Sequence, residues 1–115
     1  MVLFGSDDGQ VGGPGYREYA FIKLNGENRT TEESAKNRFR MKKMRDFPGW
    51  EKWKTQNLEG MECKVSIQRK DNSIILKTVN LGISIENITT IEEETDKVYA
   101  ALTGDRIALT DIRLE

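Results

Sequence analysis

Apolar and polar residues alternate in the second half of the chain, from residue 61 onward, and this spacing of two is typical of half-buried β-strands. Residues 16–24 follow a glycine-rich stretch and predict one early strand, of which neither face is uniformly polar. Turn-forming residues at 70–73 and at Gly104-Asp105 separate the later alternating segments. Those segments are residues 61–67, 74–79, 81–85, 98–103 and 106–114. The connections are too short for parallel crossovers, so we expect antiparallel pairing.

A different spacing between these strands predicts a helix. Thr30 and Glu33 are spaced as in a capping box, and Ala35, Phe39 and Met44 fit an apolar stripe. Pro48-Gly49 follows and would end the helix, with one more short turn over 50–54. We therefore predict a mainly β protein: an antiparallel β-sandwich with one inserted amphipathic helix near 31–46.

The length of 115 residues suits a single domain, residues 1–115, built around one core. Residues 1–15 are predicted to be a glycine-rich loop or irregular entry segment, and residues 61–115 an antiparallel meander. One sheet would then be short, and we expect the helix to cover it through Phe39, Met44 and Phe47. An open sheet edge would also allow a homo-oligomer to form.

Composition excludes several classes of function. The chain carries 18 Lys and Arg against 19 Asp and Glu, so its net charge of −1 does not commit the whole molecule to nucleic acid or membrane. It has no apolar stretch long enough to span a bilayer and no signal-peptide pattern. It has no histidine and one cysteine, which rules out an internal disulfide and triads that need histidine. No matched acid and base stand out among the carboxylates, so we predict no enzymatic activity.

Three stretches carry a resemblance to a known family. The first is VYAALTGDRIALTDIRLE (98–115), the second is Gly9 to Gly13 followed by residues 16–22, and the third is Trp50 to Trp53 followed by residues 61–65. They resemble strands of concanavalin A-like jelly-roll modules of bacterial carbohydrate-active and surface proteins, and the first is similar to the closing strands of such modules. The family's opening strands are missing or reduced to MVLF, and its R-A-D-N-x-G-W stretch is absent. The chain would then be a shortened or N-terminally truncated module.

This resemblance implies a lectin-like, non-catalytic binding module for carbohydrate, located at the cell surface or outside the cell. Trp50 and Trp53 are the first candidates, because their spacing of three places both rings on one side of a short helix, where they would stack on sugar. Tyr16, Arg17 and Tyr19 form a second candidate set. Burial of the two tryptophans as core is the alternative reading.

A basic segment supports a different reading. Residues 36–54 carry eight basic side chains against Asp46 and Glu51, which would suit the phosphates of a nucleic acid or an acidic protein surface. The alternative is the charged face of an ordinary helix. Asp7 and Asp8, beside glycines, are candidate calcium ligands, although no cofactor is expected. The candidate basic patch comprises Lys36, Arg38, Arg40, Lys42, Lys43 and Arg45.

Overall fold

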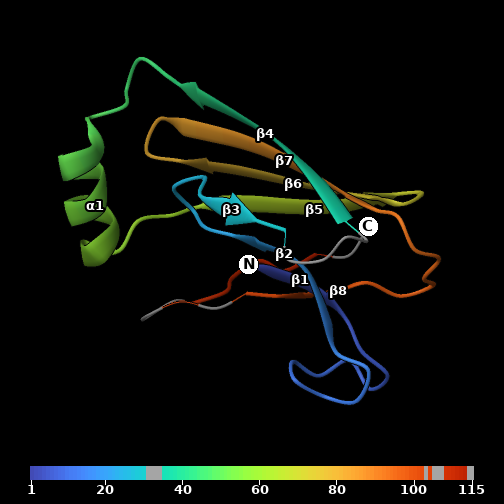
Figure 1. The fold of residues 1–115 in the computed structure, drawn as a ribbon. Coiled ribbons are helices and arrows are strands. Elements are labelled where there is room, and N and C mark those ends of the chain that lie inside the picture. Colours follow the sequence, from blue (N-terminus) through green and yellow to red (C-terminus); the bar gives the residue numbers. More distant parts are fainter. Residues whose placement is uncertain (31–34, 103, 105–107, 114–115) are drawn as a thin grey trace.

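The computed structural model of the chain describes residues 1–30, 35–102, 104 and 108–113. Its strands form two four-stranded antiparallel sheets that pack against each other, so the predicted antiparallel β-sandwich is confirmed (Figure 1). Sheet A has the order β3-β2-β1-β8, which are Asn28–Arg29, Arg17–Ile22, Val2–Gly5 and Tyr99–Ala101. Sheet B has the order β4-β7-β6-β5, which are Ala35–Lys43, Ile83–Ile91, Ser73–Asn80 and Lys64–Lys70.

In sheet B, tight turns join β5 to β6 and β6 to β7, whereas a longer connection that contains the helix joins β4 to β5. A turn at Asp71 joins β5 to β6, and a turn at Leu81 and Gly82 joins β6 to β7. Leu81 and Gly82 have φ values of 45° and 78°, the left-handed conformation that two-residue hairpins of matching twist require. The edge strand β4 pairs with β7 over its full length, from Ala35 opposite Ile91 to Lys43 opposite Ile83.

The core lies between the sheets and is apolar where β2 packs on β4 and β7. Because side chains alternate across a strand, every second residue of β6 and β7 points inward and is buried. The main cluster joins both sheets and consists of Leu3, Tyr19, Ala20, Ile22, Ala35, Ile74, Leu76 and Ile91. A smaller cluster of Trp53, Ile83 and Ile85 connects the end of sheet B to the helix.

The helix predicted near 31–46 is wrong. Residues 35–43 form β4, whereas residues 31–34 lie outside the described part of the chain. The bases of this segment repeat every two residues, and pairing with β7 buries Ala35 on the opposite face. The helix of the described residues is α1 (Trp50–Glu59), which lies at one end of sheet B (Figure 1). No helix in that described part is long and apolar enough to cross a membrane.

Two further expectations need correction. Residues 1–15 are not all irregular, because Val2–Gly5 form β1 at the centre of sheet A. The meander predicted over 61–115 holds for β5, β6 and β7, but β8 pairs with β1 in the other sheet. Residues 108–113 belong to no strand, and 105–107 and 114–115 lie outside the described residues. Association through the open edges of sheet B, β4 and β5, stays a prediction.

A polar network crosses the interior between β4 and β7. Asn37 Nδ2 donates to Asn87 Oδ1 at 2.6 Å and to Thr89 Oγ1 at 2.9 Å, and Asn87 Nδ2 donates back to Asn37 Oδ1 at 3.1 Å. Asn87 and Thr89 are fully buried, so each of these polar atoms needs its partner. A shift of β4 by one residue would separate them, and the network therefore favours a single register.

We expect Asn87→Ala to lower the free energy of unfolding by about 1–3 kcal/mol, because the amide of Asn37 would lose its partner in the interior. Urea unfolding followed by circular dichroism measures this. Ser84→Ala is the matched control, since Ser84 lies on the same strand but faces away from the core, and it should change stability by less than about 0.5 kcal/mol. Equal losses in both variants would contradict the role of the network.

Candidate functional site

The outward face of sheet B is defined by four rows of paired residues that run from β4 across β7 and β6 to β5. The end rows are Lys36-Thr90-Ser73-Lys70 and Lys42-Ser84-Val79-Lys64. The middle rows are Arg38-Ile88-Ile75-Gln68 and Arg40-Glu86-Lys77-Ser66. Lysines therefore stand at all four corners of the face. We call this surface the basic face.

The basic face is positive although the whole chain has a net charge of −1. Its outward positions hold seven bases and one acid, Glu86. Glu86 Oε2 lies 3.7 Å from Lys77 Nζ, and Lys36 Nζ lies 3.0 Å from Glu92 Oε1 just beyond β7. Arg38, Arg40 and Lys42 are exposed and form no salt bridge with a described acidic residue.

Four bases follow one another along β4. Residues two apart on a strand are separated by about 6.8 Å, so the row from Lys36 to Lys42 spans roughly 20 Å. Two neighbouring like charges, about 6.8 Å apart, repel each other by about 0.6 kcal/mol in water. A ligand with repeated negative charges would relieve this repulsion at several positions at once.

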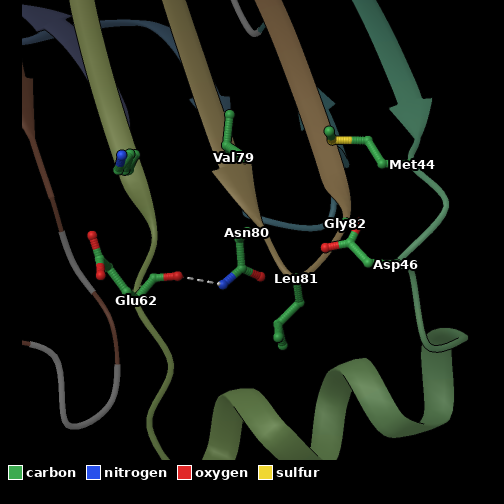
Figure 2. Close-up of a pocket in the computed structure, with 8 residues that line it drawn as sticks. Met44, Asp46, Glu62, Val79, Asn80, Leu81 and Gly82 are labelled. Atoms are coloured by element: carbon green, nitrogen blue, oxygen red, sulfur yellow. Dashed lines mark hydrogen bonds between the residues drawn. The ribbon is translucent and has the colours of Figure 1, made fainter.

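An open hollow of about 290 Å³ adjoins the basic face at its Lys42–Lys64 end. It is lined by Met44, Asp46, Glu62, Lys64, Val79, Asn80, Leu81 and Gly82. Figure 2 shows Asp46 and Glu62 on opposite sides of the turn at Leu81, with α1 below. Asn80 Nδ2 donates to the backbone oxygen of Glu62 at 3.0 Å and thereby holds the approach to β5 against β6. The two carboxylates oppose anion binding beyond this end.

The structure divides the predicted basic patch. Lys36, Arg38, Arg40 and Lys42 share the basic face, whereas Lys43 points to the other side of β4. The Lys43 ammonium lies 5.6 Å from the ring centre of Phe47 and 5.8 Å from that of Trp50. Arg45 lies in the exposed connection after β4. Sequence reasoning missed three bases that complete the face, Lys64, Lys70 and Lys77, although the sequence shows apolar residues alternating with polar ones in both of their strands, β5 and β6.

Trp50 and Trp53 do not form an open aromatic platform. Trp53 is 7% exposed and packs with Ile83 and Ile85, so the core interpretation is confirmed for this residue. Trp50 is half-buried, and its ring meets Phe47 and Trp53 edge to face at 5.0 and 5.4 Å. A hollow of about 370 Å³ beside Trp53 is lined by Lys54, Asn57 and Leu58 of the same helix.

Tyr16, Arg17 and Tyr19 lie at the start of β2, and Tyr19 has a structural role. Tyr19 is fully buried, and its hydroxyl donates to Glu93 Oε1 at 2.5 Å. Arg17 Nε lies 3.2 Å from the same oxygen, and the half-buried Tyr16 ring packs on Phe4 at 5.5 Å. The loop before β2 and the helix α1 lie far apart (Figure 1), so the two predicted sugar-contact sets are not brought together.

The candidate calcium ligands Asp7 and Asp8 lie in the loop between β1 and β2 and are exposed. Asp8 Oδ1 accepts hydrogen bonds from Ser6 Oγ and from the Gln10 backbone N–H, at 3.3 and 3.0 Å. The described residues contain no group of three or more Cys, Asp or Glu side chains placed to hold a metal ion. The hydrogen bonds of the Asp8 carboxylate hold the local turn.

Comparison with known proteins finds no match: no family model, no curated protein and no solved structure is significantly similar to this chain. The resemblance to concanavalin A-like modules stays a prediction, as does carbohydrate binding.

The bond between Tyr19 and Glu93 predicts a loss of stability at alkaline pH. Burial and the neighbouring carboxylate raise the pKa of the Tyr19 phenol above its ordinary value of 10.0. The folded protein then keeps a proton that the unfolded chain has lost. This contribution to the free energy of unfolding is fully present below about pH 10 and disappears as the pH rises through the raised pKa.

We expect Tyr19→Phe to abolish this part of the pH dependence and to lower stability at neutral pH by about 1–3 kcal/mol. Urea unfolding at about pH 8 and about pH 11 separates the two effects. Tyr16→Phe is the control, because it retains the Tyr19 hydroxyl. An equally steep alkaline loss in Tyr19→Phe and in the parent protein would show that Tyr19 is not responsible.

Proposed function

We propose that this protein is a non-catalytic binding domain that holds the phosphate backbone of a nucleic acid on its basic face. The observation that carries the proposal is the row of Lys36, Arg38, Arg40 and Lys42, four cations on one side of one edge strand. Each of these cations is exposed. Binding of phosphates along such a row releases counterions, which is the main source of affinity for nucleic acid backbones.

Two details favour phosphate over an isolated carboxylate as the bound group. Arg38 and Arg40 occupy the centre of the row, and the planar guanidinium group matches phosphate with two parallel hydrogen bonds. The ligand also has to carry charge repeatedly over roughly 20 Å, which suits a polymer better than a small anion. The salt bridge of Lys36 with Glu92 joins two largely exposed side chains, so it contributes little and a phosphate would readily replace it.

The uncharged positions of the basic face complete the surface. Ile75 and Ile88 form a half-buried aliphatic pair. Ser73 and Thr90 carry hydroxyl groups in the next row on one side, and Ser84 carries a hydroxyl group two rows away on the other side. Hydroxyl side chains commonly donate to phosphate and sugar oxygens. The face has no aromatic residue at its outward positions, so base stacking would not contribute and binding should depend weakly on sequence.

We expect Arg38→Gln combined with Arg40→Gln to weaken binding of a labelled DNA strand by about tenfold or more at low salt, because two phosphate contacts would be lost. Fluorescence anisotropy over a range of salt concentrations measures the affinity. The slope of log affinity against log salt should become shallower by about 1.4 for a single strand.

The matched control is Lys52→Gln combined with Lys54→Gln. It removes the same number of charges from α1, outside the basic face, and should leave the affinity nearly unchanged. Equal weakening by both variants would indicate a nonspecific charge effect and contradict the proposed site. Binding of neutral glycans that depends on Trp50 would favour the predicted carbohydrate module instead.

A further inference from the structure

We infer that the ligand of the basic face is a double-stranded nucleic acid, with one strand bound by the β4 row and the other by Lys64 and Lys70 of β5. This inference rests on the proposed function and extends it. It comes from the arrangement of the bases in two lines at the two edges of sheet B. An extended single strand would need only one of these lines.

The separation of the two lines matches the groove of a duplex. Three strand spacings of about 4.8 Å place β5 roughly 14 Å from β4. The major groove of B-form DNA is about 12 Å wide and is bordered by one phosphate row on each side. Lys42 and Lys64 stand at opposite ends of one paired row, and Lys36 and Lys70 at opposite ends of another. Each end of the face can therefore place a cation on both phosphate rows.

The surface between the two lines carries almost no net charge. Lys77 is the only base on its outward positions, and the carboxylate of Glu86 neutralises it at 3.7 Å. The remaining outward positions of β6 and β7 are aliphatic or hydroxyl-bearing: Ser73, Ile75, Val79, Ser84, Ile88 and Thr90. A neutral floor between two positive edges suits a groove between two phosphate rows, because a groove offers base edges and not phosphates.

The twist of sheet B also favours a duplex over a single strand as the ligand. Neighbouring strands are rotated by about 20–25°, so β5 is turned by roughly 60–75° relative to β4. The two lines of bases therefore follow a curved surface. Phosphates of a duplex wind around an axis, whereas an extended single strand would run straight along β4.

The experiment compares a short duplex DNA with one of its single strands, using anisotropy titrations of the full chain. We expect Lys64→Gln combined with Lys70→Gln to weaken duplex binding by about tenfold and to make its salt slope shallower by about 1.8, since two phosphate contacts are lost. The same variant should leave single-strand binding within about twofold of the parent. Arg38→Gln with Arg40→Gln should weaken both ligands. Lys52→Gln with Lys54→Gln is again the control of equal charge.

Two outcomes overturn the inference and leave the proposed function standing: the Lys64 and Lys70 variant binds duplex as the control does, or it weakens duplex and single strand equally. The first means that only β4 contacts the nucleic acid, and the second means that one strand crosses the whole face. If the parent chain binds neither ligand at low salt, the proposed function itself fails. Circular dichroism of each variant confirms that the fold is intact.

Discussion

The pairing of β4 with β7 is the interaction on which the rest of the structure depends. It turns the buried Ala35 and the half-buried Asn37 toward the interior of the sandwich and, because side chains alternate, it turns the four bases of β4 outward. The amide pair of Asn37 and Asn87 makes this register costly to change, since a shift by one residue would bury lysine and arginine among apolar groups. The basic face is thus a consequence of the buried side of the same strand.

The two sides of sheet B have different roles: the inner side packs in the core, and the outer side carries positive charge. Its inner side carries the core and anchors α1, whose Asn57 exchanges reciprocal amide hydrogen bonds of 3.0 Å with Asn80 of β6. Its outer side concentrates positive charge on a chain whose net charge is −1, so the acidic residues must predominate elsewhere. Such a separation of charge would orient the molecule as it approaches a polyanion.

The fold could be predicted from the sequence where local pattern and tertiary structure agree. The alternation in β6 and β7 is clear in the sequence, because one face of each strand is buried in the core, and β5 shows the same alternation although all of its residues are exposed. The segment of β4 predicts a helix through the capping-box spacing that precedes it and the spacing of Ala35, Phe39 and Met44, but ladder pairing with β7 overrides this local pattern. The helix α1 gave a weak signal, since its N-cap Gly49 makes no side-chain cap and its main anchor, Trp53, acts through tertiary packing. The number of bases in residues 36–54 predicts part of the basic patch. The position of Lys64, Lys70 and Lys77 on the same face depends on how β4, β7, β6 and β5 pair, and no local sequence pattern contains that information.

Nuclear magnetic resonance titration of the isotope-labelled protein with duplex DNA tests the location of the ligand most directly. The account predicts that backbone amide signals of Lys36, Arg38, Arg40, Lys42, Lys64 and Lys70 shift, in proportion to bound DNA. The indole N–H signals of Trp50 and Trp53 serve as internal references, because Trp53 is buried behind the sheet and Trp50 packs against it. Small shifts there and large shifts on the basic face are the expected result. Large shifts of the indole signals or of Tyr16 and Arg17, with the basic face unaffected, would contradict the account.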